Sequence, residues 1–143
     1  MNKRTEHYRS FQPLRIPGGW TVIYNKFENI DPETLAAEDE KWLSAFNEDI
    51  LLLNYKLVRE RNKHTKEQEI AVDLGWYPDG EPGGKFRLQA VLNRDWNDPL
   101  FDFSSRNKDE ITQTLEKWLW VDLMPVRFID EEYFHKTHKI KYT

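Results

Sequence analysis

The sequence predicts a single α+β domain, an antiparallel β-meander of three to four strands with two main helices packed on one face. Segments 70–77 and 86–93 alternate apolar and polar residues, which is typical of half-buried strands. Segments 42–57 and 111–119 repeat apolar residues at steps of three and four, which is typical of helices. A chain of 143 residues, 14% of them aromatic, is long enough to bury such a core as one domain.

The first expected strand covers residues 20–27 and follows a turn signal, Ile16-Pro-Gly-Gly19. Its alternation places Trp20, Val22 and Tyr24 on one face. Ile23 and Phe27 are placed on the other face. Residues 1–17 are predicted to form a loose basic leader, residues 18–125 the core, and residues 126–143 a tail that packs on the body.

Asp31-Pro32 is predicted to open the first helix, with Asp31 as the N-cap and Pro32 at the first helical position. The helix is expected to run from about residue 38 to the region of residue 55. Its apolar stripe comprises Trp42, Leu43, Phe46, Ile50, Leu53 and Leu57. The polar segment 59–68 is predicted to be a loop.

The clearest elements are the strands at 70–77 and 86–93. The segment between them, Pro78-Asp-Gly-Glu-Pro-Gly-Gly84, is dense in turn-forming residues, so the three together predict a β-hairpin. A short further strand is expected at 98–103.

Asn107 can cap the last main helix, with Glu110 as its capping-box partner. The buried stripe of this helix is Ile111, Leu115, Trp118 and Leu119. Pro125 ends the helix, and the tail that follows admits a short helix near residues 130–138.

The composition excludes some classes of protein. The chain has no cysteine, so disulfides and thiol chemistry are ruled out. Residues 1–11 lack the apolar stretch of a signal peptide, and the longest apolar run, Ile50–Leu53, is too short to span a bilayer. These features predict a cytoplasmic protein with no membrane partner.

The net charge of −4 is unevenly distributed. Segment 28–49 carries eight acidic residues and one lysine, whereas segment 1–15 carries four basic residues and one glutamate. This distribution predicts a basic protein partner and no nucleic acid. The acidic face of the first predicted helix comprises Glu38, Asp39 and Glu40. A solvated helix face explains the same charges without any partner.

Motifs for metal binding and covalent catalysis are weak. Glu132, His135 and His138 would share one side of a tail helix and could hold zinc, but helical zinc pairs usually lie four residues apart. A polar tail helix explains them without a metal, so no metal or cofactor is expected. No serine lies in a Gly-x-Ser-x-Gly elbow, and the glycine-rich segment 80–84 joins two strands instead of opening a helix.

An acidic cluster is the remaining candidate for chemistry. It comprises Asp73, Asp79, Glu81, Asp95, Asp98 and Asp102. Two of these carboxylates facing each other could act as an acid–base pair or hold a hard cation.

Two turns combine aromatic and acidic residues. Both segments, 75–80 and 95–99, are expected to place a tryptophan and acids at the same end of a strand pair, next to turns, which suits a surface for a basic partner. The predicted partner-binding residues are Trp96, Asp95, Asp98, Tyr77, Asp79 and Glu81. Trp20 and Trp76 are in register with apolar neighbours and are expected in the core, whereas Trp96 is not. Alternatively, Trp76 and Trp96 cap the edge of the core and the acids only solvate the turns.

Four strings of the sequence resemble small uncharacterised proteins of Gram-positive bacteria. They are Ile16-Pro-Gly-Gly-Trp-Thr-Val-Ile-Tyr-Asn25, Asn47-Glu-Asp-Ile-Leu51, Asp73-Leu-Gly-Trp-Tyr-Pro78, and Trp96-Asn-Asp-Pro-Leu100 with Ser105-Arg106. Some of that group are similar to immunity proteins that neutralise secreted toxins. The resemblance covers roughly residues 12–120 and implies a small, acidic, cytosolic inhibitor, but it assigns no functional residue.

The sequence therefore favours a protein-binding module, of the immunity type, that neutralises a bacterial toxin by direct binding. The alternative is a small enzyme or metal-binding protein that uses an acidic or Glu/His cluster. The sequence leans against an enzyme because it contains no established catalytic motif.

Overall fold

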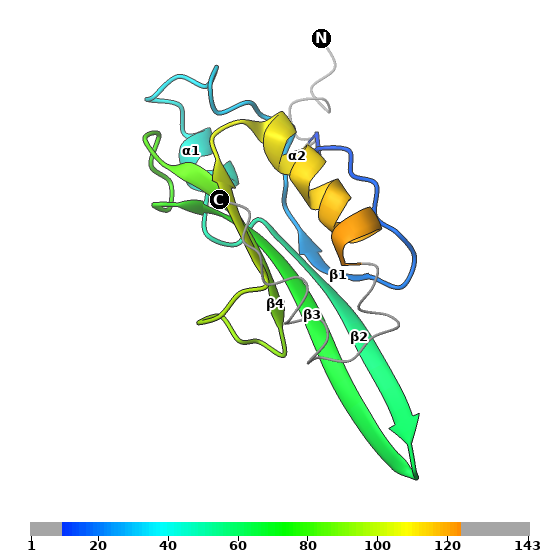
Figure 1. The fold of residues 1–143 in the computed structure, drawn as a ribbon. Helices are drawn as coiled ribbons and strands as arrows, with labels where there is room; N and C mark the ends of the chain where they lie inside the picture. The colour runs from blue at the N-terminus through cyan, green and yellow to red at the C-terminus, as the bar shows by residue number, and fades with distance from the viewer. Residues whose placement is uncertain (1–9, 124–143) are drawn as a thin grey trace.

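The computed structural model describes residues 10–123 and shows one antiparallel sheet with its helices on one side (Figure 1). The sheet has five strands in the order of the sequence: β1 (Thr21–Asn25), β2 (Leu51–Arg61), β3 (His64–Tyr77), β4 (Lys85–Leu92) and β5 (Phe101–Ser105). A short helix, α1 (Lys41–Ala45), precedes β2. A longer helix, α2 (Lys108–Lys117), follows β5 and continues into a π-helical turn, η2 (Trp118–Asp122).

The predicted fold class is wrong. The sequence predicts three to four strands and two main helices, whereas the structure has five strands and two short helices, of five and ten residues. The described chain is therefore mostly β. The two differences have one origin, because a segment predicted to be helical is a strand.

That segment is β2. Leu51, Leu53 and Leu57 lie on its buried face, each at most 7% exposed. Ile50, Leu53 and Leu57 also fit a helical spacing of three and four, so periodicity alone does not distinguish a helix from a strand here. Antiparallel pairing with β3 continues from Leu51 to Arg61 and decides for the strand.

The polar segment 59–68, predicted to be a loop, forms the end of the β2–β3 hairpin. Asn62 and Lys63 have φ angles of 53° and 66°, the left-handed pair that a two-residue type I′ turn requires. Such a turn matches the twist of the strands, so the polar residues on both sides of it pair as strands and do not form a loop. Beyond the rest of the sheet, β2 and β3 project as a two-stranded arm, which we define as residues 56–69 (Figure 1).

Asp31 and Pro32 open a turn and not a helix. The Asp31 carboxylate accepts a hydrogen bond from the Glu33 N–H at 2.8 Å, and the Asp31 carbonyl accepts one from Thr34 Oγ1 at 3.2 Å. Local bonds of this kind compete with helix propagation. Turns and irregular structure follow as far as residue 40, and only α1 is helical before β2.

The core lies between the sheet and the helices and is rich in aromatic rings. Trp76 is fully buried, as predicted, and its ring lies 5.6 Å from that of Trp42 and 4.9 Å from those of Phe46 and Phe86. Its indole N–H donates to the Glu81 carbonyl at 2.8 Å, which satisfies the one polar atom of the ring. From the α2 side the core receives the predicted stripe, Ile111, Leu115, Trp118 and Leu119.

β1 lies within the predicted first strand, but its faces are not as predicted. Val22 pairs with Leu53 and Tyr24 pairs with Leu52, so the register shifts between them. An irregularity of this type changes the face on which the following residues lie. Val22 and Tyr24, expected on one face, therefore lie on opposite faces.

Residues 10–17 are the described part of the predicted loose leader. They are attached to the body of the domain. The Arg15 N–H donates to the Glu116 carboxylate on α2 at 2.8 Å. Trp20 is partly buried and packs on the edge of the core, with its ring 5.4 Å from that of Tyr55.

The predicted cap of the last helix is confirmed. The Asn107 side chain accepts a hydrogen bond from the Glu110 N–H at 2.9 Å. The reciprocal bond of a capping box is replaced, because the Asn107 N–H donates to the Ser105 hydroxyl at 2.9 Å.

Several predictions lie outside the described residues. They concern the leader as far as residue 9, Pro125, the packing of residues 126–143, the helix near 130–138 and the Glu132, His135 and His138 cluster. Within residues 10–123, no helix is long and apolar enough to cross a membrane.

Candidate functional site

The face of the sheet opposite α1 and α2, which we call the outer face, gathers polar and aromatic side chains from all five strands. Register places Tyr24, Leu52, Asp73, Gln89 and Asp102 in one row across it. Residues directly opposite each other in an antiparallel pair share a face and lie about 5 Å apart. One cleft lies on each side of this row.

The first cleft, which we call the Trp96 cleft, has a volume of about 380 Å³. It is lined by Ile23, Leu52, Asn54, Glu69, Ala71, Arg94 and Trp96. Trp96 is 43% exposed and Ile23 is 51% exposed, whereas Ala71 is buried at the base. An apolar base with a polar rim is the usual arrangement at the centre of a protein–protein interface.

The loop that carries Trp96 is fixed to β3. Asn93 and Arg94 have φ angles of 52° and 60°, which make a tight turn at the end of β4. The Asn93 N–H donates to the Glu69 carbonyl at 2.7 Å, and the Glu69 N–H donates back to Asn93 Oδ1 at 2.9 Å. Because asparagine tolerates the left-handed backbone, Asn93 takes part in the turn and also bonds the loop to β3, which holds one wall of the cleft.

Two carboxylates, Asp49 and Asp73, lie beside the phenols of Tyr24 and Tyr77 on the outer face. The Tyr24 hydroxyl donates to Asp49 Oδ1 at 3.3 Å. Burial, and secondly the charge of Asp49, raise the pKa of Asp73 to about 6. Burial and the charge of Asp73 also raise the pKa of Tyr24 and of Tyr77. A cation placed here would relieve the repulsion between the two carboxylates, which is the second cause of the Asp73 shift.

Asp49 reaches this position because the chain before β2 crosses over Gly75 of β3. The Trp76 N–H donates to the Asn47 carbonyl at 2.9 Å, which ties the crossing segment to the strand. A Cβ atom on Gly75 would lie only 2.2 Å from the Glu48 carbonyl oxygen. Glycine at this position is thus required by the close approach of the backbone.

The second cleft has a volume of about 340 Å³ and is lined by Tyr77, Lys85, Arg87, Asp102 and Ser104. Arg87 donates to Asp102 through Nε at 3.1 Å and through Nη2 at 2.8 Å. This two-bonded pair raises the pKa of the Arg87 guanidinium and neutralises both charges. With Asp102 paired, the negative charge of the outer-face row lies at Asp73, and Asp49 adds a second carboxylate beside the row.

The predicted partner-binding residues are divided between the two ends of β4 (Figure 1). Asp95, Trp96 and Asp98 are in the β4–β5 loop, and Tyr77, Asp79 and Glu81 are at the β3–β4 loop. The expectation that both turns lie at the same end of a strand pair is wrong, because the eight residues of β4 separate them by about 27 Å. Trp96 and Tyr77 nevertheless both line clefts on the outer face.

The other predicted acids lie near α1. The Gly80 N–H donates to the Phe46 carbonyl at 2.7 Å, which holds the loop of Asp79 and Glu81 beside that helix. In the turns before α1, Glu38 and Glu40 are exposed, and Asp39 accepts a hydrogen bond from the first N–H of the helix at 2.9 Å. A role for these acids in partner binding stays a prediction.

Sequence reasoning missed several residues of the outer face. Ile23, Leu52 and Asn54 line the Trp96 cleft, and Tyr24 and Asp49 belong to the carboxylate cluster. The alternation of residues 51–57 indicates a strand with Leu52 and Asn54 on its outer face, but interpreting that segment as a helix leaves this indication unused. The sequence has no local signal that brings Asp49 next to Asp73.

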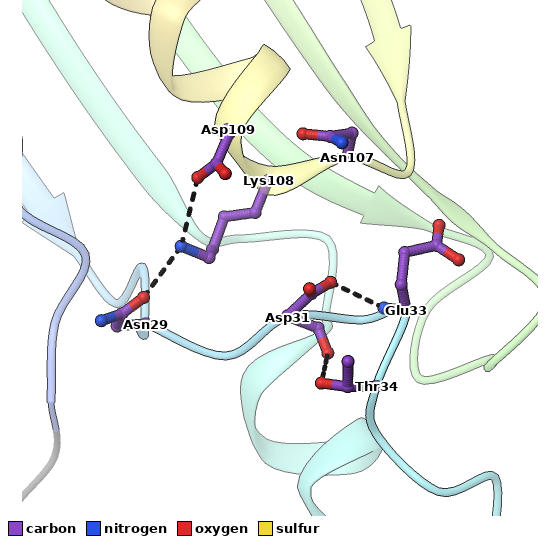
Figure 2. Close-up of a pocket in the computed structure, with 7 residues that line it drawn as sticks. All are labelled: Asn29, Asp31, Glu33, Thr34, Asn107, Lys108 and Asp109. Carbon is purple, nitrogen blue, oxygen red and sulfur yellow. Dashed lines mark hydrogen bonds and ion pairs between the residues drawn. The ribbon is translucent and has the colours of Figure 1, made fainter.

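A third hollow, at the start of α2, joins separate segments of the chain (Figure 2). It has a volume of about 370 Å³ and is lined by Asn29, Asp31, Glu33, Thr34, Asn107, Lys108 and Asp109. The Lys108 ammonium donates to Asn29 Oδ1 at 2.8 Å and to Gln12 Oε1, and Arg106 forms an ion pair with Glu33 at 3.2 Å. Because these groups already bind neighbouring segments, we interpret the hollow as a structural junction.

Comparison with known proteins finds no relative, since no family model, no curated protein and no solved structure matches the chain. In the part of the chain that the structure describes, no three His, Asp or Glu side chains are grouped so that they could hold a metal ion.

Proposed function

We propose that this protein is a binding module that recognises a basic protein partner through the outer face of its sheet. One observation carries the proposal: the half-exposed Trp96 indole borders an apolar cleft on the same face as Asp49 and Asp73. Tryptophan is enriched among the residues that dominate binding energy, and it acts best beside a pocket from which water is excluded. Nearby carboxylates favour a basic partner and accelerate its association.

The charges of the outer face support a basic partner. Arg87 is paired with Asp102, and Arg94 lies 3.6 Å from Glu69. Both arginines of the two clefts thus already face carboxylates. A lysine or arginine of the partner is the natural counterpart for the two acids between the clefts.

The site is also rigid before binding. Its base consists of paired strands, and the turn that carries Trp96 is fixed by two hydrogen bonds between Asn93 and Glu69. Ordering flexible side chains and loops reduces affinity, so a prearranged site binds more tightly for the same contacts.

We infer further that the partner is a bacterial toxin and that this protein is an immunity-type inhibitor acting in the cytoplasm. The support is the resemblance described above, because each of its four strings contributes a residue to the outer face. These residues are Tyr24, Asp49, Asp73, Tyr77 and Trp96. An inhibitor that covers the active site of its target needs a complementary surface and no catalytic group.

A small acid–base enzyme is the second candidate. One observation favours it, because a carboxyl pKa of about 6, as at Asp73, suits proton transfer near neutral pH. Asp49 would then be its partner in place of the loop acids considered from the sequence. Asp73→Asn separates the two functions: it would abolish an activity that depends on this proton, but would only weaken the binding of a protein partner.

The test of the proposed function starts from the reading frame immediately upstream of this gene, which we expect to encode a secreted protein with a toxin domain at its C-terminus. We expect a complex with a dissociation constant on the order of nanomolar by calorimetry, which is common for protein interfaces of standard size. We also expect cells that express the toxin to be rescued by this protein. If the purified proteins do not bind and the cells are not protected, the toxin proposal is wrong.

A further inference from the structure

β1 forms one edge of the sheet, and one of its two long sides is open. It pairs with β2 on one side, and among residues 10–123 no strand pairs with its other side (Figure 1). Three of its five residues are exposed and none is buried. The opposite edge strand, β5, begins with the buried Phe101 and exposes one residue of five. β1 is therefore the more accessible edge of the sheet.

Asn25 directs its backbone groups to the open side. The Lys26 N–H donates to the Ile50 carbonyl at 2.7 Å, so the backbone of residue 26 faces the side of β2. In an antiparallel pair, successive residues of a strand turn their N–H and C=O groups alternately toward the partner strand and away from it. The N–H and C=O groups of Asn25 therefore point away from β2.

Val22 has the same orientation. It lies opposite Leu53 of β2, and Leu53 lies opposite Val72 of β3. A two-residue turn joins a hydrogen-bonded pair of residues, and every second pair along the ladder from the β2–β3 turn is bonded in the same way. Counted from that turn, Leu53 bonds to Val72 and has no backbone group left for Val22. The N–H and C=O groups of Val22 therefore also face the open side.

The chain itself already pairs with the continuation of this side. Phe27, two residues after Asn25, directs its carbonyl the same way, and this carbonyl accepts a hydrogen bond from the Gln12 N–H at 2.8 Å beside an antiparallel bridge. The residue after Gln12 is Pro13, which has no N–H to continue such a ladder. The pairing ends there, so the stretch from Thr21 to Asn25, about 17 Å long, stays open.

Apolar side chains are exposed on both sides of this edge. Val22 is 46% exposed on the core side, and Ile23 is 51% exposed on the outer face, where it lines the Trp96 cleft. A further strand would lie about 5 Å from β1 and would cover one of these side chains with each of its faces. Charged residues and proline, which commonly protect edge strands from pairing, are absent from β1.

We propose that the open side of β1 pairs with an extended segment of the protein partner, which adds a sixth strand to the sheet. The inference rests on the proposed function and specifies how the partner binds. Because Ile23 belongs both to the edge and to the Trp96 cleft, a partner that fills the cleft lies next to the edge strand. Backbone bonds along an edge supply affinity, and alternating side chains supply specificity. The segment should carry β-branched or aromatic residues opposite Val22 and Ile23.

A second copy of the chain fits this edge less well than a partner segment does. The register shift in β1 bends the strand and increases its local twist. Two copies paired through β1 would place two such irregular strands against each other, and only five residues of each would pair. A partner segment without a shift can follow one irregular strand.

Amide hydrogen exchange of the full-length protein, free and in complex with the toxin domain described above, tests the proposal. We expect binding to slow the exchange of the Val22 and Asn25 amides at least about tenfold, because both would donate to the partner strand. Val58 is the matched control within the same molecule. It lies on the arm, is 62% exposed, and by the same count from the turn its N–H faces away from β3. Its exchange should not change.

Val22→Pro and Val58→Pro are the corresponding pair of variants. Each removes one N–H that bonds to no neighbouring strand, a position at which edge strands tolerate proline. We expect Val22→Pro to weaken the binding of the toxin domain at least about tenfold in calorimetry, and Val58→Pro to bind within about twofold of the wild type. Thermal midpoints report whether both variants are folded. If Val22→Pro does not fold, the exchange measurement on the wild type decides.

The outcomes separate this inference from the proposed function. If the wild type does not bind the toxin domain, the proposed function is wrong and this inference is wrong with it. If the wild type binds but Val22 and Asn25 exchange as in the free protein, or if the two proline variants bind equally, the partner uses the cleft without the edge and only this inference is wrong. If light scattering shows a dimer of the protein alone with these two amides protected, the edge pairs with a second copy and the proposal is overturned.

Discussion

Gly75→Ala tests whether the crossing of the chain over β3 holds the carboxylate cluster together. In the structure, an added Cβ would lie 2.2 Å from the Glu48 carbonyl oxygen and 2.8 Å from the Tyr77 ring. Ordinary contact requires about 3.5 Å, so the crossing segment must move by about 1 Å. The backbone oxygen cannot rotate away as a side chain could.

The cost of this movement has two parts. Crowding in a well-packed region costs about 1–3 kcal/mol. Moving the segment also strains the hydrogen bonds from Trp76 to Asn47 and from Ile50 to Leu74, each of which contributes about 1 kcal/mol. The lower chain entropy of alanine in the unfolded state offsets about 0.4–1 kcal/mol. We therefore expect Gly75→Ala to lower the free energy of unfolding by about 2–4 kcal/mol.

The assay is urea denaturation at neutral pH, with the slope against urea compared to confirm that the same surface is exposed. Gly83→Ala is the matched control, because an added Cβ there meets no atom within 4 Å and its φ is not left-handed. We expect the control to be neutral or slightly stabilising. If Gly75→Ala unfolds within about 0.5 kcal/mol of the control, the crossing segment does not lie over Gly75 as described.

Two further predictions concern the same face. The pKa of Asp73 is about 6 in the folded protein, against 3.8 for an ordinary aspartate. Between these values the folded state binds more protons than the unfolded state, so the free energy of unfolding falls as the pH rises from about 4 to about 6. Asp73→Asn should remove that fall, which we expect to be on the order of 1–2 kcal/mol in the free energy of unfolding after allowance for partial exposure. Urea midpoints of the wild type and the variant at about pH 4 and about pH 6 measure the difference. If the variant keeps the pH profile of the wild type, the raised pKa of Asp73 is contradicted. Asn93→Gly keeps the left-handed turn but removes the acceptor for the Glu69 N–H. It should change stability by no more than about 1 kcal/mol and weaken partner binding several-fold in calorimetry, and unchanged affinity would show that the turn need not be fixed.

The sequence predicts those elements that depend on neighbouring residues. The β3–β4 hairpin follows from alternation on both sides of a turn-rich loop. The cap of α2 follows from a bond between Asn107 and Glu110, three residues apart. The core position of Trp76 follows from its register with apolar neighbours.

The elements that depend on distant residues could not be predicted in this way. Ile50, Leu53 and Leu57 fit a helix as well as a strand, and pairing with β3 decides between them. The register shift in β1 likewise depends on β2 and moves Tyr24 to the outer face. Because the segment of β2 was predicted to be helical, the prediction lacked one strand and the cleft residues that this strand carries.

The candidate site was predictable only in part. The lack of apolar register around Trp96 indicates a surface position, which agrees with its exposure. The approach of Asp49 to Asp73 depends on a glycine that admits a crossing backbone, and no spacing in the sequence indicates it. Sequence reasoning therefore finds the aromatic side of the surface but misses its central acids.

The central claim, that the Trp96 cleft is the centre of a partner-binding surface, is tested most directly by comparing Trp96→Ala with Trp120→Ala. The two indoles are equally exposed, at 43% and 44%, but Trp120 lies in η2, away from the outer face. By calorimetry against the toxin domain, Trp96→Ala should lose at least about 2 kcal/mol of binding free energy, roughly thirtyfold in affinity, while Trp120→Ala binds nearly as the wild type does. Equal affinities for Trp96→Ala and the wild type would contradict the account.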